Sequence, residues 1–149
     1  MPLISLSQEV IDRGKLPEVG WSLARLNDVV EFKAAQGNST NYLFEFVIEH
    51  GPEKSDKNSG RYCSTLFNSK ALGMGEGSKG VPDVINKFVL MVSGLLGINK
   101  SELEADDYDT DKLKGKSCWI KIEAITDQNG KLGMGISDYT SSQSGNVPF

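Results

Sequence analysis

Alternation of apolar and polar residues predicts β-strands over much of this chain. The clearest case is TNYLFEFVIEHG at 40–51, in which Phe44, Phe46 and Ile48 share one face. Similar runs predict further strands at 20–35, 61–69, 116–127 and 131–142. In the first of these the alternation slips near Asn27 and Asp28, which predicts a bend or a bulge.

Between the third and fourth strands the apolar period becomes helical. Residues 81–98, VPDVINKFVLMVSGLLGI, predict a helix with Pro82 in its first turn and Gly97 at its end. Residues 1–19 show no clear period and are predicted to form an N-terminal arm with one short helical turn. Residues 141–149 are small and polar before their last three positions, so we predict a flexible tail.

The predicted order of elements is three strands, one helix and two strands. This is the order of an OB-fold, a five-stranded Greek-key barrel with one helix between strands three and four. We therefore predict a mainly β OB-fold domain over residues 20–140. An open α+β sandwich with a covering helix is the main alternative. A chain of 149 residues is long enough for one such domain with its own core.

Charge is distributed unevenly along the chain. The net charge of −4 argues at first against a nucleic-acid partner, but residues 101–111, SELEADDYDTD, hold six acidic residues and no basic one. The remainder of the chain therefore carries +2 and can still offer a basic face. The acidic segment either competes with nucleic acid for that face or is a solvated loop.

Several stretches resemble motifs of catalysis or metal binding but lack residues that those motifs require. GKS at 115–117 lacks the earlier glycine of a phosphate loop, and DYDTD at 107–111 lacks the glycine and closing glutamate of a calcium loop. His50 has no ligand-spaced partner, and Cys63 and Cys118 are predicted to be reduced, partly buried thiols. We predict that the protein is not an enzyme and binds no metal or cofactor.

No apolar run reaches the length of a membrane span, and the first residues do not resemble a secretory signal. We therefore predict a cytoplasmic protein without a membrane partner.

Aromatic and cationic residues on the outside of a small barrel suit a single nucleic-acid strand, because bases stack on rings while Lys and Arg meet phosphates. In the fourth strand an apolar face of Cys118, Ile120, Ile122 and Ala124 turns Trp119 and Lys121 outward. Alternatively, the helix or the arm covers Trp119. In the third strand, either Arg61 with Phe67 or Tyr62 must face out. The candidate DNA contacts are Arg25, Lys33, Tyr42, Arg61, Tyr62, Phe67, Trp119 and Lys121.

Several stretches together resemble a known family. They are GWSLARL, GNSTNYLFEFVIEHGP, SGRYCSTLFN and LKGKSCWIKIEAITDQNGKLGMGISDY, and they cover roughly residues 18–140. In these stretches the chain resembles the phage-encoded single-stranded-DNA-binding proteins of OB-fold type. The resemblance implies DNA binding with little sequence preference, during phage replication or recombination in the host cytoplasm. It also implies contacts by Tyr42, Arg61, Tyr62 and Trp119 with Lys33 and Lys121.

The last residues, Val147, Pro148 and Phe149, resemble the aromatic tip with which bacterial and phage single-strand binders commonly end. The resemblance implies recruitment of replication or recombination proteins, but the preceding TSSQSGN lacks the acidic residues of such tails. The alternative is that the tip folds back onto the barrel or a neighbouring subunit.

The sequence leaves homo-oligomerisation open. The alternative function is an OB-like structural or adaptor module for a protein partner, and a weaker one is an accessory domain of a nuclease or recombinase.

Overall fold

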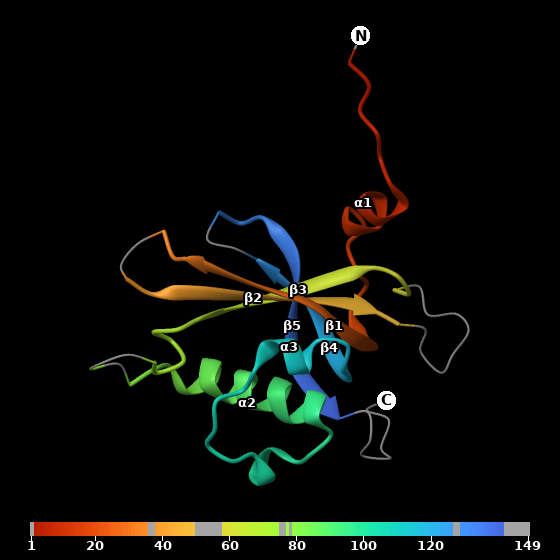
Figure 1. The fold of residues 1–149 in the computed structure, drawn as a ribbon. Coiled ribbons are helices and arrows are strands. Elements are labelled where there is room, and N and C mark those ends of the chain that lie inside the picture. The colour runs from red at the N-terminus through yellow and green to blue at the C-terminus, as the bar shows by residue number, and fades with distance from the viewer. Residues whose placement is uncertain are drawn as a thin grey trace.

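The computed structural model describes residues 2–35, 38–49, 58–74, 77, 79–126 and 129–141 (Figure 1). His50 and residues 142–149, which include the tail tip, lie outside the described residues. The elements are, in chain order, α1 (Gln8–Arg13), β1 (Gly20–Lys33), β2 (Thr40–Ile48), β3 (Tyr62–Asn68), α2 (Pro82–Leu96), a 3-10 turn (Lys100–Glu102), α3 (Thr110–Leu113), β4 (Ser117–Thr126) and β5 (Leu132–Ser141).

The five strands form one antiparallel sheet in the order β3-β2-β1-β4-β5. The predicted order of three strands, one helix and two strands is therefore confirmed, and α1 confirms the predicted helical turn in the arm. Strand β1 joins the two halves of the sheet, because it pairs with β4 over residues 20–25 and with β2 over residues 24–33. Ala24 and Arg25 are the two positions in these ladders that pair on both sides.

The sheet is not closed into a barrel, which corrects the predicted barrel. In the described part of the chain, β3 pairs with β2 alone and β5 with β4 alone, so these two strands are the edges. The sheet curls enough to bring Tyr139 of β5 beside Thr65 of β3. A cavity of about 550 Å³ lies between the edges, and Val84 and Lys87 of α2 line it too. Side chains of the helix thus border the gap that a closing ladder would span.

The predicted irregularity near Asn27 and Asp28 is confirmed. Pairing between β1 and β2 shifts between Leu26 and Asp28. An extra residue on one strand turns all following side chains to the opposite face. Leu26 therefore points into the core, whereas Val30 and Phe32 further along the same strand are 45% and 43% exposed.

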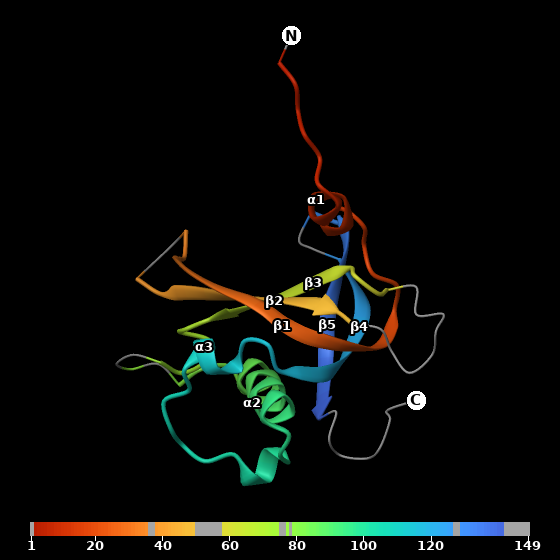
Figure 2. The ribbon, with the colours of Figure 1, turned by 45° about the vertical axis from the view of Figure 1, so that its right-hand side comes forward.

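Helix α2 covers one end of the curved sheet, and α1 lies at the opposite end (Figure 2). Helix α2 begins with Pro82 and ends before Gly97, as the sequence predicts, and Gly97 has φ 75° and ψ 27°. Its Phe88 packs edge-to-face against Phe44 and Phe67, with ring centroids 6.1 and 5.2 Å away. The buried core comprises Ala24, Leu26, Phe44, Phe46, Ile48, Cys63, Phe67, Met91, Val92, Leu95, Leu113, Cys118, Ile120, Ile122, Ile136 and Tyr139.

The acidic segment 101–111 connects α2 to β4 and is exposed at most of its positions. Its end is ordered by Asp109, which caps α3 by accepting a hydrogen bond from the Asp111 amide at 2.9 Å. Lys114 reaches both Asp111 and Asp28 of β1 at 3.3 Å. Its hydrogen bond lowers the pKa of Asp28. One end of the segment is thereby connected to the sheet through a lysine.

Both cysteines are free, as predicted, and both are buried rather than partly buried. Burial raises the pKa of Cys63 to about 11 and that of Cys118 to about 12, against an ordinary value of 9.0. Neither thiol ionises at neutral pH in the folded protein, which makes both poor nucleophiles.

We expect the two thiols to destabilise the fold in alkali. Below pH 9.0 they are protonated in both states and contribute nothing. Above it the unfolded chain binds fewer protons than the folded one, so the free energy of unfolding falls by about 1.4 kcal/mol per pH unit for each thiol. Urea unfolding from pH 8 to 10.5 measures this slope, which should be shallower for Cys118→Ala. Parallel slopes for the two proteins would contradict the assignment.

Candidate nucleic-acid interface

An apolar strip crosses the outer face of β1, β2 and β3. Val30, Leu43 and Leu66 are direct cross-strand partners, and such partners point to the same face of a sheet. Phe32 lies two residues beyond Val30 and therefore on the same face. Leu66 is 50% exposed, and Val30 and Phe32 are exposed to a similar extent. We call Val30, Phe32, Leu43 and Leu66 the outer strip.

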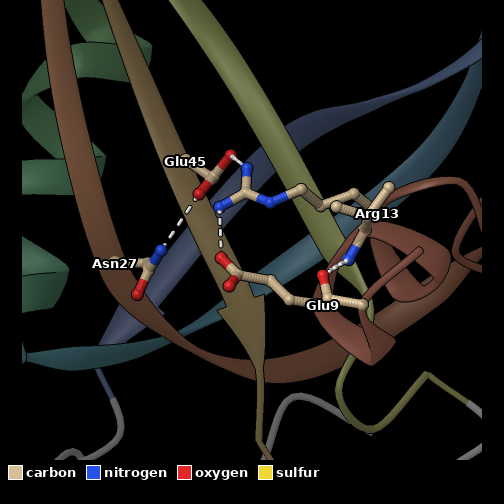
Figure 3. Close-up of polar contacts among 6 residues, drawn as sticks. Glu9, Arg13, Asn27 and Glu45 are labelled. Atoms are coloured by element: carbon tan, nitrogen blue, oxygen red, sulfur yellow. Dashed lines mark hydrogen bonds and ion pairs between the residues drawn. The ribbon is translucent and has the colours of Figure 1, made fainter. Parts of the chain in front are cut away.

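Tyr62 lies on this same face, and its ring is covered by a cation. The guanidinium carbon of Arg13, at the end of α1, is 4.5 Å from the centre of the Tyr62 ring. Arg13 also forms ion pairs with Glu9, at 2.9 Å, and with Glu45 of β2. Glu45 accepts a further hydrogen bond from Asn27 at 3.0 Å (Figure 3). A positive group above an aromatic ring is thus held in place by two carboxylates.

The end of the N-terminal arm is attached next to this cluster. Arg61 donates a hydrogen bond to the Leu16 carbonyl at 2.9 Å. Asn58, which is 5% exposed, accepts from the Glu18 amide at 2.7 Å and donates to the Glu18 carbonyl at 3.0 Å. It also donates to the Ser22 hydroxyl at 3.2 Å. The arm from residue 13 to residue 18 therefore runs along the start of β3, beside Arg61 and Tyr62.

The predicted cations do not gather into one basic face. Arg25 lies 3.7 Å from Glu49, and Lys121 lies 3.4 Å from Glu123. Lys33 is exposed at the far end of β1, opposite Thr40. Ion pairs between exposed side chains contribute about 0–1 kcal/mol, so a phosphate can displace the carboxylates at little cost.

Three of the aromatic side chains predicted to contact DNA are buried or partly buried in this structure. Phe67 is 3% exposed because the alternation of β3 points it at α2, and Tyr62 is the residue that faces out. Tyr42 is partly buried against the core. Trp119 does point away from the core residues Cys118 and Ile120, as predicted, yet it is 6% exposed.

The predicted inward face of β4 is correct at Cys118, Ile120 and Ile122 and wrong at Ala124. Ala124 is exposed together with the neighbouring residues 123–126 at the end of β4. This part of the β4–β5 hairpin therefore lies outside the core.

Two residues of the face were missed in the sequence. Phe32 was missed because its outward position depends on the bulge, five positions earlier. The predicted bulge was the sequence signal that could have indicated this position. Arg13 was missed because its contact with Tyr62 joins positions far apart in sequence. The Glu9–Arg13 spacing of four residues indicates an ion pair along one helix but says nothing about what lies beneath it.

Within the described residues, no group of three or more His, Cys, Asp or Glu side chains could hold a metal ion. In the same part of the chain no helix has both the length and the apolar character needed to cross a bilayer. The sequence matches no protein-family model and no curated protein at a significant level.

Proposed function

We propose that this protein binds single-stranded DNA with little sequence preference, through the outer face of β1, β2 and β3. The strand order, with β3 and β5 as edges and a helix between β3 and β4, supports a partly open OB-type sheet. Proteins of that architecture bind oligonucleotides on the face of strands two and three. The proposal includes action in phage replication or recombination, in the host cytoplasm, with partner recruitment by Val147, Pro148 and Phe149.

The observation that carries the proposal is the pair of outward aromatic rings on this face. Phe32 is exposed at one end of the outer strip, and Tyr62 lies near the other end beneath the Arg13 guanidinium. Bases stack on such rings whatever their identity, and apolar neighbours such as Leu43 and Leu66 exclude water beside them. A base that stacks on Tyr62 would take the position of Arg13, which would then be available for a phosphate.

Phosphate contacts would come from cations bordering the rings. Arg25 is two strands from Tyr62 in the same cross-strand row, through Val47. Lys33 is next to Phe32 in sequence, and Arg61 is next to Tyr62. The contacts of Arg25 and Arg61 require exchange of a surface partner, a carboxylate for Arg25 and the Leu16 carbonyl for Arg61. Affinity should therefore fall strongly as salt concentration rises.

We expect Phe32→Ala to raise the dissociation constant for oligo-dT by roughly 5- to 150-fold, because one stacked base contributes about 1–3 kcal/mol. Fluorescence anisotropy of labelled oligo-dT, at two salt concentrations, measures this. Val81→Ala removes a similarly exposed apolar side chain outside the proposed site and should bind like the wild type. No binding by the wild type at low salt would overturn the proposal.

A protein-binding adaptor is the second candidate, and a specific observation favours it. The outer strip is apolar while Arg13, Arg25 and Lys121 each pair with a carboxylate, so the face carries less free positive charge than DNA binders usually show. This function predicts association that changes little with salt. The salt series above therefore separates the two candidates.

A further inference from the structure

The outer strip leads to a cavity at the edge of the sheet. Val30, Leu43 and Leu66 are partners in one row across β1, β2 and β3, and β3 is an edge strand. Leu43 and Leu66 also line the cavity of about 550 Å³ at this edge, which we call the edge cavity. Ligand pockets in proteins usually measure about 300–1,000 Å³, so the edge cavity is large enough for one nucleotide. The outer strip and the edge cavity therefore form one continuous surface.

The edge cavity combines apolar walls with hydroxyl groups. Val84 of α2, Ile125 of β4 and Met134 of β5 face it together with the leucines of the outer strip. Ser64 of β3 and Ser137 of β5 add hydroxyls to the lining. Apolar walls suit the face of a base, and a few polar groups can fix its orientation.

The edge cavity also borders the second exposed ring of the proposed site. A smaller cavity of about 240 Å³ is lined by Tyr62 and Arg13. It shares Ser64 and Met134 with the edge cavity, so the two cavities adjoin at these residues. The edge cavity thus connects the outer strip, which carries Phe32, to the surroundings of Tyr62.

Lys87 of α2 gives the edge cavity a positive charge. The charged residues of its lining are Lys87 and Glu123, and Glu123 lies 3.4 Å from Lys121, which offsets the charge of that carboxylate. Lys87 is exposed and forms no ion pair within the described part of the chain. Its ammonium group is therefore available to a phosphate, whereas Arg25 must first exchange a carboxylate.

We propose that one nucleotide of a bound single strand of DNA occupies the edge cavity, with its phosphate on Lys87. The strand passes from Phe32 across Leu66 into the edge cavity and continues along β3 to Tyr62. This path brings α2 into the interface and gives Lys87 a role as a DNA contact. The inference rests on the proposed function and adds to it a third nucleotide position between the two rings.

Lysine acetylation of the wild-type protein, with and without saturating oligo-dT, locates the contact by mass spectrometry. Labelling of Lys33 and Lys87 should fall several-fold on binding. Labelling of Lys112, which is exposed on α3 and does not line the edge cavity, should not change. Protection of Lys33 without protection of Lys87 would overturn the edge-cavity site and leave the proposed function intact. A wild type that does not bind oligo-dT at low salt would overturn both.

Lys87→Gln measures how much this contact contributes. One phosphate contact to a single strand adds about 0.7 to the slope of log K against log salt concentration. The variant should lose that amount, so its dissociation constant should be about fivefold higher than that of the wild type at 0.1 M salt and equal near 1 M. Lys87→Arg keeps the charge and should bind like the wild type. Lys112→Gln is the control with the same change of net charge and should keep the wild-type slope. Equal slopes for the two glutamine variants would overturn the proposal.

Discussion

Replacing Phe67 with alanine is expected to lower the free energy of unfolding by about 3–5 kcal/mol. The ring is 3% exposed and lies edge-to-face against Phe44 and Phe88, with centroids 5.7 and 5.2 Å away. Its removal leaves a void where β2, β3 and α2 meet, and rigid neighbouring rings fill such voids poorly. Urea unfolding followed by circular dichroism measures the loss.

Phe32→Ala is the matched control, because it removes the same side chain from an exposed position. We expect it to change the free energy of unfolding by less than about 0.5 kcal/mol. The two variants therefore separate a core phenylalanine from a binding-face phenylalanine. Equal stability losses would show that the assignment of inner and outer faces after the bulge is incorrect.

Asn58→Ala is expected to cost about 1–3 kcal/mol and to release the arm from the sheet. Asn58 is buried and bonds both backbone groups of Glu18 as well as the buried Ser22 hydroxyl, so alanine removes the partner of two partly buried backbone groups and of one buried hydroxyl. Hydrogen exchange of the Glu18 amide measures the release locally. That amide should exchange faster in the variant, by more than the amides of β2 in the centre of the sheet.

Ser59→Ala is the control for this second variant. The adjacent Ser59 hydroxyl is buried and has no hydrogen-bond partner among the described residues. Its removal should leave both stability and Glu18 exchange close to the wild-type values. If Asn58→Ala behaved like Ser59→Ala, the side chain of Asn58 would not be what holds the arm.

Local pattern was sufficient to predict most elements of the fold. The alternation of β2, the helical spacing of α2 and the slip near Asn27 each depend on residues within one element, and the structure confirms them. The closure of the sheet was not predictable in this way. It depends on how far two edges approach each other, and side chains from the first turns of α2 border the space between them.

The candidate site was less predictable than the fold, because its geometry is set by distant partners. Period-two alternation separates Tyr62 from Phe67 but does not say which of them faces α2. Likewise, a cation in the sequence carries no sign of the carboxylate beside it, as Arg25 with Glu49 shows. The burial of Trp119 on a face turned away from the core also depends on tertiary packing.

The double pairing of β1 has a mechanical consequence. Strands β2 and β3 lie on one side of β1, and strands β4 and β5 lie on the other. Both sides pair with β1 at Ala24 and Arg25. The bulge follows within three residues and is a point where a strand bends readily. Because β4 pairs with β1 only at residues 20–25, the parts of β1, β2 and β3 beyond the bulge follow that bend without β4 and β5. The bulge therefore sets the direction of the part of β1 that carries Val30 and Phe32, separately from the β4–β5 hairpin.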